Sequence, residues 1–293
     1  MIYYIENDYL KVGINSFGGS LTSIYNKLNN HEMLYQPREN GWSGQDVVIF
    51  PFVGRLKNKE YTVSNKKYSM EIHGLIRYTE VEVTKHEDEK IVLEYESNDN
   101  SLKSYPFKFI FNIIYTLNDN KLSVKYEVVN NDEKTLYYGV GGHPAFICDG
   151  CDLDDYFDIS GNYITIETDK QIGKIELNDQ GTFIAGKGNE VCDKTIHLSK
   201  EYIMKEKTLI LDSSNIKNVT LNRINKDKVI ISLYDCNYLA FWTDEKHGNF
   251  IAIEPWWSLP DYEEGSIELS EKPSILSLES GKSKVHEYVI TIE

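Results

Sequence analysis

The sequence is poor in cysteine, with 4 residues in 293, and no stretch approaches the roughly 20 consecutive apolar residues of a membrane-spanning helix. It also lacks the basic start and apolar continuation that mark a secretory signal peptide. Disulfides are rare in reducing compartments. The scarcity of cysteine and the missing signal pattern therefore predict a cytoplasmic protein with reduced thiols.

Positive charge is also scarce, because 31 lysine and arginine residues stand against 46 aspartate and glutamate residues. The formal net charge is -15 at pH 7. Such a surface repels the phosphates of nucleic acids and the headgroups of anionic membranes. We therefore expect neither a nucleic acid nor a membrane as a partner.

Several catalytic motifs are missing: G-x-G-x-x-G, the P-loop, the G-x-S-x-G elbow and H-E-x-x-H. Cys148 and Cys151 have the C-x-x-C spacing of redox and metal sites, but no second pair completes a structural zinc site. Asp149 and Gly150 between them are typical of a turn, so we interpret the cysteines as reduced thiols. The sequence indicates no metal and no cofactor.

What the sequence has is an apolar period of two. Apolar and polar residues alternate at 91–95, at 122–128 and at 285–292, the last with one slip between Val285 and Tyr288. This period is typical of strands with one buried face, and the 21 tyrosines suit pleated surfaces. Beta strands are therefore expected to dominate the fold.

Turn-forming clusters recur between such stretches and predict hairpins. They stand at Gly18-Gly19, Asn65-Lys66, 98–100, 118–120, 130–132 and 225–227. The one helical piece expected is short, near 199–205, and no linker divides the chain. The sequence predicts an all-β fold, a single antiparallel β-sandwich domain over residues 1–293.

Four clusters place polar side chains beside glycine or proline. In the first, 50–55, Arg55 closes an apolar segment, and its guanidinium is able to fork two hydrogen bonds onto a ligand. The alternative is a surface arginine after a turn. In the second, 72–77, His73 stands in an apolar stretch, where a structural histidine is commoner than a catalytic one.

The third cluster is Gly139 to Phe146, in which three glycines precede His143. Glycines permit an unusual backbone path and the close approach of a ligand. Pro144 disfavours a helical conformation at His143, which favours a presented imidazole over a buried one. A structural histidine at a strand end is the alternative.

The fourth cluster ends a buried run with Glu254 beside Trp256 and Trp257. A carboxylate in such a place is costly unless it is partnered or functional. Aromatic faces beside polar groups suit carbohydrates, whose C–H faces are apolar and whose hydroxyls need donors and acceptors. The alternative is a rim glutamate next to core tryptophans.

Other polar residues we interpret as solvated. They are the acidic run from Asp261 to Glu264 and the remaining histidines, His31, His86, His197, His247 and His286.

The order Arg, His-Gly, His-Pro, Glu on an all-β chain resembles the aldose 1-epimerase (galactose mutarotase-like) superfamily, most closely its LacX-like bacterial branch. The resemblance covers nearly the whole chain. It implies a large, twisted β-sandwich with a sugar lying across one sheet. It also implies an isomerase that interconverts hexose anomers without a cofactor, with a small-molecule sugar as its partner. Monomer and homodimer both stay open.

Roles follow from the resemblance residue by residue. It implies that Glu254 is the general base, His143 the general acid and His73 a residue that helps hold the sugar. We expect all three to be catalytic, with His73 and Arg55 supporting the charge that develops on the ring oxygen. Arg55 matches a sugar-contacting arginine, and Trp256 is expected at the sugar. The family's sugar-contacting aspartate has no clear match, so Glu206 and Asp212 are the candidates.

One departure and three alternatives accompany these expectations. Phe50 stands where better-studied members have asparagine. A glycoside hydrolase needs two carboxylates, and a non-catalytic carbohydrate-binding protein needs none. A hexose-6-phosphate mutarotase needs extra cations around the phosphate, for which Lys57 and Lys59 are candidates, although we favour their being ordinary surface lysines.

Overall fold

The computed structural model describes residues 1–39, 41–148, 159–178, 180–184, 190–199, 208–224, 227–244 and 249–293. No helix in these ranges is long and apolar enough to cross a membrane. The expected helical piece near 199–205 lies outside them apart from Ser199. Within them helix is confined to α1 (Ser101–Ser104) and to 3-10 turns at Lys57–Lys59, Ile76–Tyr78 and Leu269–Glu271.

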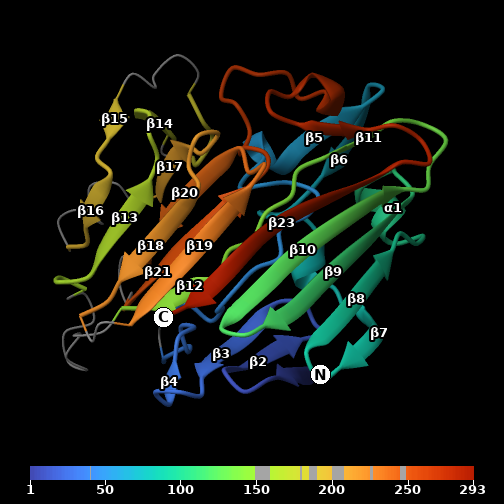
Figure 1. Ribbon diagram of the computed structural model, residues 1–293. Coiled ribbons are helices and arrows are strands. Elements are labelled where there is room, and N and C mark those ends of the chain that lie inside the picture. Colours follow the sequence, from blue (N-terminus) through green and yellow to red (C-terminus); the bar gives the residue numbers. More distant parts are fainter. Residues whose placement is uncertain are drawn as a thin grey trace.

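The largest sheet in the described residues has nine strands and crosses the whole molecule in Figure 1. Every neighbouring pair in it is antiparallel. Its order is β16 (Thr195–His197), β13 (Tyr163–Glu167), β18 (Asn218–Asn222), β19 (Lys228–Tyr234), β23 (Ser283–Ile292), β10 (Lys121–Asn130), β9 (Phe109–Asn118), β8 (Lys90–Glu96) and β7 (Glu82–Glu87).

A second large sheet, of six strands in the described ranges, carries the site discussed below. Its order is β12 (Ala145–Ile147), β21 (Phe250–Trp256), β20 (Tyr238–Trp242), β17 (Thr208–Asp212), β14 (Ile172–Ile175) and β15 (Val191–Cys192).

Smaller sheets close the edges of the molecule, with the N-terminal one below the nine-stranded sheet in Figure 1. They are β1 (Ile2–Glu6), β2 (Leu10–Asn15), β3 (Leu21–Asn26) and β4 (His31–Glu32); β5 (Glu60–Val63) with β6 (Lys66–Ser69); and β11 (Leu136–Tyr138) with β22 (Leu276–Leu278).

The alternation read from the sequence sets the faces of these strands. In β10 the predicted apolar positions 122–128 are buried and their neighbours are half-buried. The turn cluster at 118–120 joins β9 to β10, with Asp119 in the left-handed region at φ 52°. Side chains of both large sheets, such as Phe111 and Ile253, belong to one buried apolar cluster. The predicted all-β antiparallel sandwich is confirmed.

Strand β23 corrects one expectation, because the alternation runs through it without a slip. His286 is buried together with Tyr288, whereas Val285 is exposed. The His286 Nε2 lies 2.9 Å from the hydroxyl of Tyr138, and its ring packs against Trp257. His286 is therefore a core residue and not a solvated one, since strand geometry outweighs the polarity of one side chain.

This histidine makes stability depend on pH. Burial lowers the pKa of His286 from 6.5 to about 4, so the unfolded chain binds the extra proton first as pH falls between these values. Its contribution to stability is therefore lost between pH 6.5 and about 4. We expect the free energy of unfolding of His286→Gln to fall less steeply than that of the wild type as pH decreases through this window, by up to ~1.4 kcal/mol per pH unit. Urea unfolding of both proteins across the window measures this, and parallel curves would contradict it.

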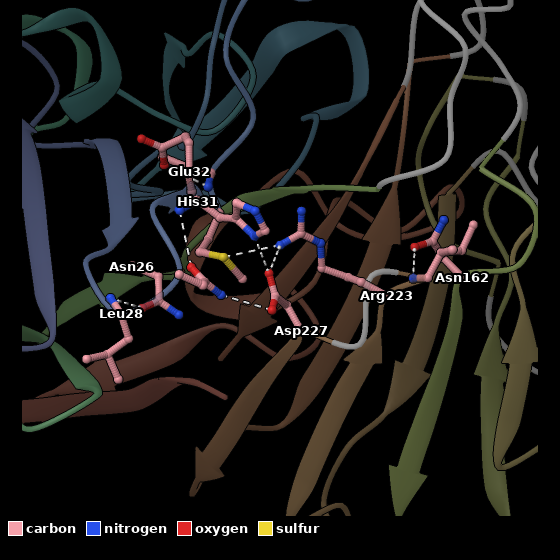
Figure 2. Close-up of polar contacts among 11 residues, drawn as sticks. Asn26, Leu28, His31, Glu32, Asn162, Arg223 and Asp227 are labelled. Atoms are coloured by element: carbon pink, nitrogen blue, oxygen red, sulfur yellow. Dashed lines mark hydrogen bonds and ion pairs between the residues drawn. The ribbon is translucent and has the colours of Figure 1, made fainter.

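A polar network ties the N-terminal sheet to the nine-stranded sheet (Figure 2). Asp227 accepts a hydrogen bond from Asn29 Nδ2 at 2.9 Å, and one of its oxygens lies 2.8 Å from His31 Nδ1. Arg223 Nη1 lies 3.6 Å from the same Asp227 oxygen and 3.2 Å from the sulfur of Met33. Because these contacts join residues almost 200 positions apart, they fix the small sheet against β18 and β19.

Candidate active site

A cavity of about 290 Å³ lies over the outer face of the six-stranded sheet. Alternation in β21 explains the choice of residues there. Ile251 and Ile253 point into the core between the sheets, so Ala252 and Glu254 point the other way. The sheet contributes Glu254, Trp256, Trp242 and Thr208 to the cavity wall, and loops contribute Trp42, Arg55, His73, Arg77 and His143.

Glu254 is the one carboxylate that lines this cavity among the described residues. It is 1% exposed, and its Oε1 lies 3.3 Å from His143 Nε2. Its Oε2 has no hydrogen-bond partner among the described residues. Burial raises the pKa of Glu254 well above its usual value, although the nearby indole of Trp256 favours the ionised form. This buried glutamate therefore has one carboxylate oxygen without a partner in the described part of the chain.

His143 is buried rather than presented as expected, yet it lines the cavity. Within the described ranges, its Nδ1 has no hydrogen-bond partner. Trp42 and Trp242 surround the ring, at centroid distances of 5.3 and 5.5 Å. Burial, followed by the positive charge of Arg77, lowers the pKa of His143 to about 3. The imidazole is therefore neutral at pH 7 when no ligand is bound.

The glycines before His143 serve the protein's own packing rather than a ligand. A Cβ on Gly141 would lie 2.7 Å from the Trp256 ring, and one on Gly142 would lie 2.6 Å from the Tyr288 hydroxyl. Gly142 N also donates to the carbonyl of Pro255 at 3.0 Å. Glycine is required because this segment packs directly on the end of β21, which brings His143 beside Glu254.

Asp46 is a site residue that the sequence analysis missed. It is 5% exposed and accepts hydrogen bonds from the backbone N–H of His143 at 3.2 Å and of Leu21 at 3.0 Å. Burial raises its pKa to about 6. Its only signal in the sequence is an aspartate directly before the apolar run that starts at Val47. Asp46 anchors the backbone of His143 without touching the cavity.

His73 is buried and lies at right angles to His143, with ring centroids 5.5 Å apart. Its backbone has the unusual φ of 63°, which holds the side chain toward the cavity. Its Nδ1 accepts a hydrogen bond from Gly54 N–H at 3.3 Å, so the ring proton is on Nε2. Burial lowers the pKa of His73 well below its usual value. His73 is therefore a neutral hydrogen-bond donor.

Two arginines line the cavity, Arg55 as expected and Arg77, which the sequence analysis passed over. Arg77 stands four residues after His73, on the 3-10 turn Ile76–Tyr78, and its guanidinium lies 4.9 Å from the Tyr78 ring centre. Neither guanidinium has an ion pair with a carboxylate in the described residues. Both are free to bind a ligand. Lys57 and Lys59 are exposed and do not line the cavity.

Of the two tryptophans beside Glu254 in the sequence, Trp256 lies at the cavity and Trp257 does not. Trp256 lines the cavity, and its buried Nε1 has no hydrogen-bond partner in the described part of the chain. Trp257 points into the core and packs on His286. The half-buried rings of Trp42 and Trp242 supply the aromatic wall instead, edge to face at 5.3 Å. Trp256 is the last residue of β21 and Trp257 is the first residue after it, and the two neighbouring indoles lie in different apolar clusters.

The remaining expectations concern the candidate sugar-contacting acids Asp212 and Glu206 and the absence of a metal site. Asp212 ends β17 on the same face as Glu254, but it is exposed and does not line the cavity. Glu206, Cys151 and His247 lie outside the described residues. Among the described residues, no three His, Cys, Asp or Glu side chains gather as metal ligands.

Asp261 also differs from its expected place in a solvated loop. It is 7% exposed and pairs with the equally buried Lys272. The rest of the acidic run follows the expectation, with Glu263 and Glu264 exposed.

Comparisons with known proteins show the family of the chain. The model of the aldose 1-epimerase family matches residues 1–290. The chromosomally encoded protein LacX of Lactococcus lactis is 28% identical over 306 residues, covering 100% of this chain and 99% of LacX.

Solved structures show the same fold. A galactose mutarotase related enzyme from Lactobacillus acidophilus has a TM-score of 0.92 and 30% identity, covering 100% of this chain and 97% of its own. A galactose mutarotase-like protein from Lactobacillus casei has a TM-score of 0.90 and 26% identity, with both chains covered completely. Family membership supports a carbohydrate epimerase or mutarotase function. The chain belongs to the aldose 1-epimerase family, as a LacX-like member with the galactose mutarotase-like fold.

Proposed function

We propose that this protein is a mutarotase that interconverts the α and β anomers of a hexose by opening and closing the sugar ring. One observation carries the proposal. Glu254 and His143 contact each other at 3.3 Å, both line a cavity of about 290 Å³, and each has a buried polar atom without a hydrogen-bond partner among the described residues. This volume is near the lower end of the roughly 300–1,000 Å³ range of small-molecule pockets, which suits a monosaccharide.

The reaction needs one base and one acid close together. The base takes the proton of the anomeric hydroxyl while the acid protonates the ring oxygen, and the C1–O5 bond breaks. Rotation about C1–C2 and the reverse transfers close the ring on the other face. The anomeric hydroxyl oxygen and the ring oxygen are both bonded to C1. Two neighbouring side chains such as Glu254 and His143 are therefore suitably spaced to exchange protons with them.

The two residues conserve their protons through the cycle. Before opening, Glu254 is ionised and His143 protonated; afterwards Glu254 is protonated and His143 neutral. Both states hold one proton in total, so no exchange with solvent is required. Without a ligand, burial raises the pKa of Glu254 and lowers that of His143, so the one proton is on Glu254 and has to pass to His143 across their 3.3 Å contact before the ring opens.

Other groups support binding and charge development. The Nε2–H of His73 is a neutral donor to a sugar oxygen, and Arg55 is able to fork two hydrogen bonds to sugar hydroxyls. Trp42 and Trp242 offer aromatic faces to the C–H groups of the ring. A glycosidase needs a second carboxylate, and Glu254 has none beside it in the described cavity wall.

The test follows anomer interconversion by polarimetry or proton NMR, with freshly dissolved α-D-glucose, α-D-galactose and their 6-phosphates. Acceleration above the spontaneous rate supports the proposal. Binding of these sugars without acceleration would instead support a carbohydrate-binding protein.

A hexose 6-phosphate is the second candidate substrate, favoured by the guanidiniums of Arg55 and Arg77, which line the cavity and have no ion pair with any described carboxylate. We expect Arg77→Gln to lower kcat/KM for the phosphorylated sugar by about tenfold or more relative to the free sugar, because a charge-assisted hydrogen bond to phosphate is lost. Lys59→Gln is the matched control, since Lys59 is exposed and pairs with Glu71 outside the cavity. An unchanged ratio in Arg77→Gln would exclude a phosphate at this position.

A further inference from the structure

A buried ion pair stands just behind the mouth of the cavity. Asp261 follows β21, and Lys272 follows the 3-10 turn Leu269–Glu271. Each is 7% exposed, and Lys272 Nζ donates to Asp261 Oδ1 in a short contact. Neither side chain lines the cavity. The mechanism proposed above does not use them.

Asp261 holds the backbone at Arg55 and two residues after it. Its N–H donates to the carbonyl of Arg55 at 3.0 Å, and its Oδ2 accepts the N–H of Lys57 at 2.9 Å. Its carbonyl also accepts the N–H of Phe183 at 2.8 Å. Three segments that contribute to the cavity wall, around residues 55, 181 and 260, therefore meet at one aspartate.

Packing at the same point leaves Arg55 little freedom at its base. Gly54 has a φ of +63°, and a Cβ there would lie 2.5 Å from the ring of Pro260. The stem of Arg55 passes Gly181, where a Cβ would lie 3.3 Å from Arg55 Cδ. The exposed guanidinium of Arg55 has no ion pair in the described residues. The orientation of the side chain therefore depends on the position of its backbone and on the packing of its stem.

Stability alone does not explain the presence of the Asp261–Lys272 pair, because replacing a buried ion pair by apolar residues is often neutral or stabilising. A carboxylate, however, can accept from a cation and from a backbone N–H at the same time. Lys272 holds Oδ1, which leaves Oδ2 aimed at Lys57 N–H.

We propose that Asp261 and Lys272 form a positioning pair that fixes the direction of Arg55 at the cavity mouth. Resting on the mutarotase function proposed above, the pair then sets the affinity for the sugar and leaves the proton transfers at Glu254 and His143 unchanged. The two are positioning residues, since neither lines the cavity.

The first test needs no substrate. Asp261→Asn leaves the Lys272 charge buried, so Asp261→Asn/Lys272→Gln is studied with it as a neutral amide pair. Hydrogen exchange followed by mass spectrometry is expected to accelerate about tenfold or more in peptides covering 54–59, and not in peptides covering β21. Glu264→Gln, an exposed carboxylate on the same loop, is the control. Unchanged exchange in 54–59, with a fold intact by thermal melting, would overturn the proposal.

The second test is kinetic and uses a double-mutant cycle with Arg55→Ala. The amide pair is expected to raise KM about tenfold with kcat within about twofold, because a misdirected contact weakens binding. In the Arg55→Ala background the same change is expected to have no effect on KM. An equal effect in both backgrounds would show that the pair acts on the fold at large and would overturn the proposal. If the wild type accelerates the interconversion of no sugar, the proposed mutarotase function is wrong. Hydrogen exchange still tests whether Asp261 and Lys272 position Arg55.

Discussion

Glu254→Gln is expected to slow anomer interconversion by about 10²–10⁴-fold on the sugar that the wild type prefers. The amide keeps the size of the carboxyl group but is unable to take the proton of the anomeric hydroxyl. KM is expected to change little, because the buried side chain still fills its place on β21. Initial rates by polarimetry, corrected for the spontaneous reaction, measure the loss.

The control for this variant is Asp212→Asn, which removes a carboxylate from the same face of the sheet outside the cavity. Its activity is expected to stay within about twofold of the wild type, as for surface changes away from a site. Near wild-type turnover in Glu254→Gln would show that Glu254 is not the base. A large loss in Asp212→Asn would return Asp212 to the sugar site.

The pH profile gives an independent measure of the same role. The pair works with one proton, and the raised pKa of Glu254 marks the loss of that proton as pH increases. Activity is therefore expected to fall as pH rises through this pKa. On the acid side, activity persists as long as the chain is folded, because a second proton binds His143 only near its pKa of about 3. Any residual activity of Glu254→Gln is expected to lack the alkaline decline.

His143→Asn is expected to cause a loss of similar size, about 10²–10⁴-fold in kcat, because the ring oxygen loses its proton donor. The shorter side chain also leaves Glu254 Oε1 without its contact at 3.3 Å. The decisive measurement is the double variant Glu254→Gln/His143→Asn. Residues that act as one unit are not additive, so the double variant is expected to be little slower than either single one.

Two outcomes would contradict this view of His143. Multiplied losses in the double variant would mean that the two residues act in separate steps. A loss confined to KM would mean that His143 holds the sugar and transfers no proton. Circular dichroism and thermal melting exclude the trivial case in which the variant is unfolded.

The local sequence by itself determined the strands and much of the site. The backbone of a strand turns successive side chains to opposite faces, so the period of two along 122–128 identified β10 from neighbouring residues alone. Glycine and asparagine clusters marked the hairpins for the same local reason. Polar residues in apolar surroundings identified Arg55, His73, His143 and Glu254, and the structure brings all four to one cavity.

The tertiary structure decided which polar residues are buried and which tryptophans reach the cavity. His286 and Asp261 are polar in sequence, yet packing between sheets and loops buries both. Trp42 and Trp242 gave no stronger signal than Trp257, which faces the core. Their places depend on which face of which sheet meets solvent, and a short window of sequence does not contain that information.

Contacts between residues that are far apart in the sequence are also visible only in the folded chain. Asp46 meets His143 across 97 positions of sequence, and the backbone N–H of Lys57 meets Asp261 across 204. Arg77 becomes a cavity residue because the turn carrying it folds over the sheet. Hydrogen bonds and ion pairs act over a few ångströms, so they depend on which strands become neighbours. The residues proposed to do the chemistry could be found in the sequence, whereas the residues that hold them in place were decided by tertiary packing.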